Sequence, residues 1–225
     1  MIAKTALVTG ANRGLGLAFC KELAKRNYTI FALCRRASNE LNAKNIHVHE
    51  GLDLNSAEQI KKIPTLFRST NLDLVINNAA IGFDDCFDSI DTHGLLQQYN
   101  VNAVAPLLLS QALVPLMNLK SKIALISSRM GSISKNDIGK SYAYRMSKAA
   151  LNMLGKNLSL DLKNKGIAVG VYSPGQVDTD MLRVLGTYSG RPPHDAASKI
   201  LDLIDDLNLN NSGNFWHIDG SILPW

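Results

Sequence analysis

Short apolar runs alternate with stretches of helical apolar spacing along the chain. The runs predict strands at residues 4–8, 29–34, 47–54, 72–76, 122–126, 167–172 and 214–218. Apolar residues three or four positions apart predict helices at 15–25, 56–67, 92–119, 142–165 and 195–207. Several strands are apolar throughout, which is typical of parallel strands covered on both faces. The pattern predicts an α/β fold: a doubly wound parallel sheet in three α/β/α layers.

The chain has 225 residues, of which 46% are hydrophobic and 19% charged. These values suit a single globular domain spanning residues 1–225, and no linker or internal repeat divides it. The longest apolar stretch, 101–117, contains Asn102, Ser110 and two prolines. It therefore predicts a buried helix, and we expect no membrane association.

The formal net charge is +5, but the basic residues are scattered and do not form the long runs typical of nucleic-acid binding. A basic chain could bind a membrane surface, an anionic cofactor or nucleic acid, and the charge alone decides poorly between these, but we expect no nucleic-acid binding. The three cysteines are widely separated, which suits buried thiols in a reducing, cytoplasmic location. His47 and His49 have no third ligand nearby, so we expect no metal site.

A glycine-rich turn, TGANRGLG, joins the first strand to the first helix over residues 9–16. Glycine lets a backbone turn sharply and approach a phosphate closely, and the helix N-terminus offers free N–H groups to an anion. The spacing, G-x-x-x-G-x-G, differs from the general dinucleotide fingerprint, and a plain tight turn is the alternative. Its position after the first strand favours a dinucleotide site.

The second strand ends in Leu-Cys-Arg35-Arg36, where an NAD site usually carries an acid. Guanidinium groups at that point suit the 2′-phosphate of NADP, and Arg13 of the glycine turn could reach the same phosphate. A solvated loop end is the alternative. Asp53 and Asn77 end the next two strands at the same edge, although either could simply cap a turn. We therefore expect NADP(H) as the cofactor.

Tyr144 and Lys148 are four residues apart and share one face of a predicted helix. A nearby ammonium group should lower the phenol pKa from about 10 toward neutrality, so the phenol could exchange a proton with a carbonyl or alcohol oxygen. Ser128 ends the preceding strand, where its hydroxyl could bond the same oxygen. We choose Ser128 because Ser127 should alternate to the other face. Turn capping by both serines is the alternative.

Several motifs occur in one order: TGANRGLG, Asn77-Asn-Ala-Ala80, Asn102, Ser128, Tyr144-Arg-Met-Ser-Lys148 and PGQVDT. Together they resemble the short-chain dehydrogenase/reductase family over nearly the whole chain. The stretches SSRMGSIS and YAYRMSKAALNM and the ending DGSILPW are similar to its C-factor and sniffer-like carbonyl reductase branch. The resemblance implies a Rossmann sheet.

The resemblance also implies roles for individual residues. Tyr144 would be the general acid/base, and Lys148 would bind the nicotinamide ribose and lower the tyrosine pKa. Ser128 would orient the carbonyl, and Asn102 would anchor a water in a proton relay to Lys148. The implied cofactor-binding residues are Gly10, Asn12, Arg13, Gly14, Leu15, Gly16, Arg35, Asp53, Leu54, Asn77, Ala79, Tyr144, Lys148, Pro174, Gly175, Val177 and Thr179.

The chain departs from the family pattern in three places. Ala80 stands where the family usually has glycine, which bears on how closely the backbone can approach the cofactor. The gap between Ser128 and Tyr144 is long, so residues around 134–140 should reshape the substrate entrance. The segment 180–193 must supply a short substrate loop and leave an open site.

The implied function is an NADP(H)-dependent oxidoreductase that interconverts a carbonyl and an alcohol on a small-molecule substrate, assembled as a homodimer or homotetramer. The alternative is an NADP-binding signalling or scaffold protein with little turnover. An epimerase or dehydratase fits less well, because few residues follow Thr179.

Overall fold

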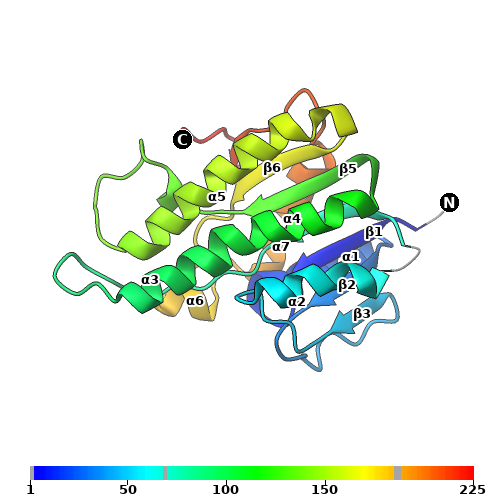
Figure 1. Cartoon of the computed structure of the whole chain (residues 1–225), viewed down its shortest axis with the longest axis horizontal. Helices are drawn as coiled ribbons and strands as arrows, with labels where there is room; N and C mark the ends of the chain where they lie inside the picture. Colours follow the sequence, from blue (N-terminus) through cyan, green and yellow to red (C-terminus); the bar gives the residue numbers. More distant parts are fainter. Residues whose placement is uncertain (1–2, 68–69, 185–188) are drawn as a thin grey trace.

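The computed structural model describes residues 3–67, 70–184 and 189–225, and shows one parallel sheet in the order β3-β2-β1-β4-β5-β6-β7 (Figure 1). The strands are β1 Thr5–Thr9, β2 Thr29–Leu33, β3 Ile46–His49, β4 Leu72–Asn77, β5 Met117–Ile126, β6 Ala168–Ser173 and β7 Phe215–His217. The order reverses direction between β1 and β4. Ligands of doubly wound sheets bind at the carboxyl edge of such a point.

Helices cover both faces of the sheet (Figure 1). Helices α1 (Gly14–Lys25) and α7 (Pro193–Asp205) pack together on one face. The other face carries α2 (Ala57–Lys62), α3 (Thr92–Tyr99), α4 (Ala105–Leu113) and α5 (Tyr142–Asp161). The short helix α6 (Asp180–Val184) follows β6. The predicted three-layer, doubly wound α/β fold is confirmed.

Two apolar cores lie on opposite faces of the sheet, because side chains alternate along each strand. In β4, Leu74 joins the core beneath α1 and α7, and Val75 joins the core beneath α2, α4 and α5. Phe19 of α1 and Leu151 of α5 are almost fully buried on their respective sides. Burial on both faces explains why the strands read as continuous apolar runs.

The predicted helix 92–119 is wrong in its continuity and its end. Helix α3 passes into the π-helical segment η2 (Asn100–Val104) and then into α4. Pro106 has no N–H to donate to the Asn102 carbonyl four residues earlier, so a regular α-helix cannot run through this point without losing a bond. A 3₁₀ turn, η3 (Val114–Leu116), follows α4, and β5 already begins at Met117.

The third strand is also shorter than the predicted 47–54, since β3 ends at His49. The chain turns at Gly51, whose φ of +80° lies in the left-handed region, and Asp53 therefore lies on the following loop. Helix α5 ends at Asp161, before the predicted residue 165. Of the predicted substrate loop 180–193, α6 forms the first part, and residues 185–188 lie outside the described residues.

Cys20 and Cys34 are buried as predicted, but Cys86 is exposed because it lies on the loop between β4 and α3. In the part of the chain that the structure describes, no helix is long and apolar enough to cross a membrane.

Candidate active site

The carboxyl ends of the central strands open into a cavity of about 1240 Å³. The cavity collects most of the residues that the sequence singled out. They are Gly10, Asn12, Arg13, Gly14, Leu15, Gly16, Arg35, Asp53, Leu54, Ala79, Ser128, Tyr144, Lys148, Pro174, Gly175, Val177 and Thr179. Asn77 and Asn102 do not line it. One cavity thus collects the glycine turn, Ser128 and the pair Tyr144 and Lys148, which are far apart in the sequence.

The glycine turn has no room for a Cβ at Gly10 or Gly16. A Cβ on Gly16 would lie 2.1 Å from the Gly10 oxygen, and both Gly10 and Gly14 have left-handed φ angles of +65° and +53°. Arg13 precedes α1 without a capping hydrogen bond from its side chain. The N-terminus of this twelve-residue helix therefore presents main-chain N–H groups to the cavity, an arrangement that suits a phosphate.

Asn78, and not the predicted Asn77, lines the cavity beside this turn. The Asn78 side-chain amide donates to the Thr9 main-chain oxygen over 2.9 Å, and the main-chain N–H groups of Asn78 and Ala79 both donate to the Thr9 hydroxyl over 3.0 Å. Asn77 is the last residue of β4, and its side chain is 4% exposed. The structure therefore places the residue after the strand, Asn78, on the cavity wall, and Asn77 behind it.

The two arginines expected at the 2′-phosphate differ in their surroundings. The Arg13 guanidinium forms a 2.7 Å ion pair with Asp180, and both side chains are largely exposed. Such exposed pairs contribute about 1 kcal/mol or less, so an incoming phosphate can displace the carboxylate. Arg35 lines the cavity and forms no ion pair within the described ranges. The structure thus leaves Arg35 available to an anionic ligand.

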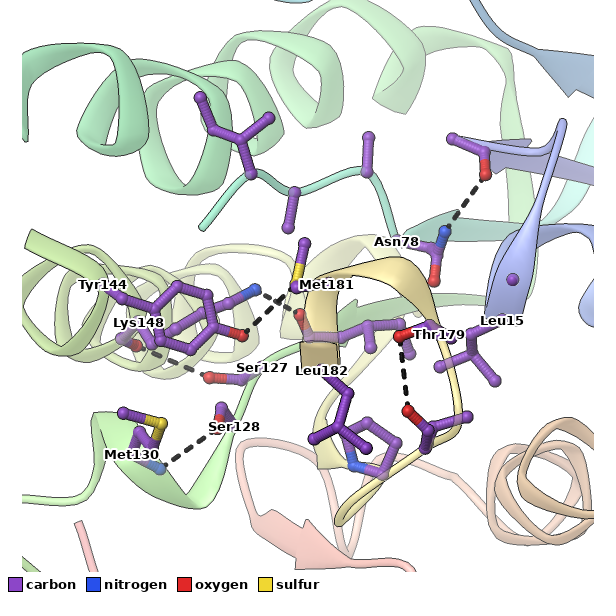
Figure 2. Close-up of a pocket in the computed structure, with 18 of the residues that line it drawn as sticks. Leu15, Asn78, Ser127, Ser128, Met130, Tyr144, Lys148, Thr179, Met181 and Leu182 are labelled. Atoms are coloured by element: carbon purple, nitrogen blue, oxygen red, sulfur yellow. Dashed lines mark hydrogen bonds between the residues drawn. The ribbon is translucent and has the colours of Figure 1, made fainter. Parts of the chain in front are cut away.

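Tyr144 and Lys148 lie one turn apart at the N-terminal end of α5 (Figure 2). The Lys148 ammonium group is 5.6 Å from the centre of the Tyr144 ring and donates a 2.9 Å hydrogen bond to the Ile126 oxygen. The Tyr144 hydroxyl faces the Met181 sulfur, 3.9 Å away. Both side chains are buried yet line the cavity.

The pKa of Tyr144 is opposite in direction to the sequence prediction. Burial raises it to about 12, and the neighbouring Ser128 hydroxyl opposes this only in part. Burial also lowers the pKa of Lys148 to about 7. The expected lowering of the tyrosine pKa is absent because desolvation dominates, and because the lysine is bound to a carbonyl oxygen and is easily neutralised. The phenol therefore holds its proton at neutral pH.

Two adjacent serines at the end of β5 face different surroundings. Ser128 lines the cavity, and its hydroxyl accepts a 3.1 Å hydrogen bond from the Met130 N–H (Figure 2). The Ser127 hydroxyl also reaches the cavity lining but donates to the Asn152 side chain over 2.6 Å. Asn152 in turn donates to the Gly131 oxygen. Ser127 thus fastens the strand end to α5, whereas the Ser128 hydroxyl neighbours the Tyr144 phenol in the cavity.

Asn102 is fully buried behind the cavity wall. Its side-chain oxygen accepts from the Ile81 N–H, and its amide donates to the Ile81 oxygen and the Ser147 hydroxyl over 2.9 and 3.0 Å. No amide proton remains for a water. The main-chain carbonyl of Asn102 is the group that Pro106 deprives of a helical donor. The side chain therefore holds the cavity wall together.

Sequence reasoning missed the apolar residues beside Tyr144. Ile81, Met130, Met181 and Leu182 all line the cavity but lie on loops or short helices, where periodicity carries no signal. His217 also lines it, with Nδ1 3.0 Å from the Asp219 carboxylate. The cavity thus joins an anion-binding turn to a protonated phenol among apolar side chains, which suits proton transfer to a ligand oxygen.

Comparison with known proteins agrees with this arrangement. The family model described as short chain dehydrogenase matches residues 4–188. The chain is 34% identical to 1-hydroxy-2-glutathionyl-2-methyl-3-butene dehydrogenase of Rhodococcus sp. (strain AD45) over 224 residues, which cover 98% of this chain and 99% of the relative.

Two solved structures are similar over almost the whole chain. The carbonyl reductase Sniffer of D. melanogaster is 30% identical with a TM-score of 0.89, covering 99% of this chain and 100% of its own. The NADPH-bound carbonyl reductase from chicken fatty liver is 30% identical with a TM-score of 0.87, covering 100% of both chains. The resemblance to sniffer-like carbonyl reductases is confirmed, and the chain belongs to the short-chain dehydrogenase/reductase family of oxidoreductases.

Proposed function

We propose that residues 1–225 form a single-domain, NADP(H)-dependent oxidoreductase that interconverts a carbonyl and an alcohol. One observation carries the proposal: the buried, protonated Tyr144 phenol and the Ser128 hydroxyl line the same cavity as the glycine turn before α1. A dinucleotide held at that turn would share the cavity with Tyr144 and Ser128. The reactive end of a cofactor and a proton donor would then share one substrate position.

The residues fit NADP(H) as the cofactor. The glycine turn would hold the pyrophosphate, and Arg35, with Arg13 after release from Asp180, would hold the 2′-phosphate. The similar carbonyl reductase from chicken was solved with NADPH bound, which supports the same choice here. When bound, the nicotinamide supplies or accepts the hydride. Thr179 and Val177 line the cavity where its carboxamide would lie.

The protein's own residues supply the proton. The raised pKa keeps the proton on Tyr144 at neutral pH until charge develops on the carbonyl oxygen that accepts it. Ser128 would donate a hydrogen bond to the same oxygen and stabilise that charge. Lys148 has a pKa near 7 and therefore gains and loses a proton readily at neutral pH. It would return a proton to the Tyr144 phenolate after each turnover.

Asn102 would complete the proton path through its main-chain carbonyl. Its side chain forms hydrogen bonds with Ile81 and Ser147 and so holds this wall of the cavity in place. A water on that carbonyl would connect Lys148 with solvent. This assignment keeps Asn102 in the relay that the family resemblance implies, with the main chain as the water-binding group.

Both reaction directions are open to the proposed enzyme. The Rhodococcus relative is named as a dehydrogenase of a 1-hydroxy compound, and the Drosophila neighbour as a carbonyl reductase. Tyr144 serves either direction, because a group that donates a proton to a carbonyl accepts it back from an alcohol. Assays should therefore follow NADPH oxidation with carbonyls and NADP⁺ reduction with alcohols.

The deciding experiment measures NADPH oxidation with a panel of aldehydes, ketones and quinones. Tyr144→Phe should lower kcat by about 10²- to 10⁴-fold and change the NADPH dissociation constant little. Tyr142→Phe is the matched control, because Tyr142 lies two residues away and is exposed. Full activity in Tyr144→Phe would contradict the proposed role. Tight NADPH binding without turnover of any carbonyl would favour the signalling or scaffold alternative.

The same fold presents a surface for assembly, and we propose a homodimer or homotetramer. On α5, the exposed residues Met146, Met153 and Leu160 recur every seven positions and so share one face. Helix α3 packs against α5 and adds exposed Leu96 and Tyr99. A row of large exposed apolar side chains across two neighbouring helices is typical of a subunit interface.

A further inference from the structure

Four basic side chains line the cavity around Tyr144: Arg129, Lys135, Lys140 and Arg145. Across the described residues, none of the four forms an ion pair. The remaining cations of the cavity are accounted for differently. Arg13 and Arg183 pair with aspartates, Lys148 donates to the Ile126 oxygen, and Arg35 follows β2 at the glycine-turn end. The catalytic end of the cavity therefore carries its own excess of positive charge.

The acids on the same part of the lining do not cancel this charge. Asp84 and Asp137 are exposed and line the cavity, against the four cations named above. Neither aspartate bonds to any of these cations within the described ranges. The nearby Asp85 is engaged elsewhere, since its carboxylate accepts hydrogen bonds from the Tyr142 and Ala143 N–H groups. Two positive charges remain in excess.

Arg145 is the most precisely held of the four cations. It is half-buried, and its Nε donates 3.0 Å hydrogen bonds to the carbonyl oxygens of Gly139 and Lys140. Its two terminal nitrogens have no hydrogen-bond partner among the described residues. A guanidinium fixed through Nε and free at both ends presents a planar pair of donors. Such a pair matches the two oxygens of a carboxylate.

The loop that fixes Arg145 has a costly conformation. Gly139, Lys140 and Ser141 have successive left-handed φ angles of +71°, +56° and +48°. For the two non-glycine residues this costs about 1–2 kcal/mol each. The Asp85 main-chain oxygen accepts from the Ser141 N–H over 3.0 Å, and the Asp85 carboxylate caps α5 immediately afterwards. Strain of this kind concentrates at functional positions, here beside Tyr144.

We propose that the substrate is an anionic carbonyl or alcohol compound whose carboxylate is bound by Arg145 together with Lys140 and Arg129. Met130 and Ile138 also line this region, so an apolar body would separate the anion from the reacting carbon. This inference rests on the proposed oxidoreductase function and adds the class of substrate. The other cation, Lys135, contributes to attraction from a distance.

Three matched benzaldehydes test the charge preference directly. They are 4-carboxybenzaldehyde, its neutral methyl ester, and 4-(trimethylammonio)benzaldehyde. With NADPH oxidation as the readout, kcat/KM for the acid should exceed that for the ester by about tenfold or more, and the cation should be poorest. Added salt should lower the value for the acid and leave that for the ester nearly constant, because ions screen exposed charges. An ester reduced as well as the acid overturns the inference.

Single substitutions then locate the contact. Arg145→Gln should lower the acid-to-ester ratio of kcat/KM about tenfold, and the double variant Arg129→Gln/Lys140→Gln should lower it as well. Arg145→Lys should keep a higher acid-to-ester ratio than Arg145→Gln, because it retains the positive charge but loses the planar pair of donors. Lys163→Gln removes one exposed charge from η5 at the far end of α5 and should leave the ratio unchanged. A ratio insensitive to residues 129, 140 and 145 overturns the inference.

Binding of the product alcohols separates this inference from the proposed function. Calorimetry should show 4-(hydroxymethyl)benzoate binding the NADP⁺-loaded protein about tenfold more tightly than its methyl ester. Equal binding of acid and ester overturns the anionic preference, even if both aldehydes are reduced. Preferential binding of the acid without turnover of any aldehyde contradicts the oxidoreductase proposal and leaves an anion site beside Tyr144.

Discussion

The Lys148 ammonium group donates a 2.9 Å hydrogen bond to the main-chain oxygen of Ile126, the last residue of β5. This contact ties the helix that carries Tyr144 to the strand that leads into Ser128. It also places an ionisable group where burial lowers its pKa to about 7. The cavity is therefore lined by a lysine that is partly neutral at physiological pH. Its lowered pKa makes the free energy of unfolding depend on pH.

Lys148 should make the free energy of unfolding rise with pH. Between pH 7 and the ordinary lysine value near 10.4, the unfolded chain binds a proton that the folded chain lacks, so stability rises by about 1.4 kcal/mol per pH unit. Relative to Lys148→Met, the ligand-free wild type should gain about 2–3 kcal/mol between pH 7.5 and 9.5, measured by urea unfolding. Lys163→Met should follow the wild-type slope. Parallel curves for wild type and Lys148→Met would contradict the lowered pKa.

Ser128 and Ser127 should respond differently to removal of their hydroxyls. Ser128→Ala should lower kcat by about 10²-fold or more, because a donor to the developing oxyanion is lost. Ser127→Ala breaks the 2.6 Å bond to Asn152 and should reduce the free energy of unfolding by about 1–3 kcal/mol, with a smaller effect on kcat. Steady-state kinetics and denaturant unfolding of both variants check the assignment. A larger kcat loss in Ser127→Ala would reverse it.

Arg35 should carry most of the discrimination between NADPH and NADH. Removing a charge-assisted contact to the 2′-phosphate costs about 1.5–3 kcal/mol, so Arg35→Ala should weaken NADPH binding about 10- to 100-fold and leave NADH binding nearly unchanged. Nucleotide fluorescence gives both dissociation constants. Arg36→Ala is the neighbouring control, since Arg36 does not line the cavity. Asp180→Asn should tighten NADPH binding, because it frees Arg13 from its ion pair. Unchanged discrimination in Arg35→Ala would move the contact to Arg13.

The sequence was sufficient to predict the sheet, because strands buried on both faces leave continuous apolar runs such as residues 123–126 of β5. It did not predict which residue at the end of a strand lines the cavity. The sequence placed the strand-ending Asn77 at the cavity, whereas Asn77 is buried and the next residue, Asn78, lines the cavity. It also missed the start of β5 at Met117, since the first residues of that strand are largely exposed and polar.

Other features of the site depend on conformations that no local pattern encodes. The Arg145 guanidinium is oriented by its hydrogen bonds to the main-chain oxygens of Gly139 and Lys140. The positions of these oxygens depend on left-handed backbone angles. The pKa of Tyr144 depends on how completely the tertiary fold removes water from the phenol. The helical spacing of Tyr144 and Lys148 was visible in the sequence, but the surroundings that set the sign of the pKa shift were not.

The exposed row on α5 should mediate self-association. Met153 lies at its centre and is 62% exposed, so Met153→Glu should place a charge in a buried interface and yield monomers in sedimentation velocity experiments. Leu119→Glu is the control, because Leu119 is equally apolar, 76% exposed and outside the row. Wild-type assembly that persists in Met153→Glu and is lost in Leu119→Glu would place the interface elsewhere. A monomeric wild type would contradict the proposed oligomer.

Asp85 should act as a positioning residue for Tyr144. Its carboxylate accepts hydrogen bonds from the Tyr142 and Ala143 N–H groups, so a loop 57 residues earlier caps the helix that carries the proton donor. Asp85→Ala should cost about 1–2 kcal/mol of unfolding free energy and lower kcat more than it changes the NADPH dissociation constant. Asp85→Asn, which keeps one acceptor, should recover part of both losses. Asp88→Ala, on the same exposed loop, is the control. A stability loss in Asp85→Ala with unchanged kcat would restrict Asp85 to holding the fold.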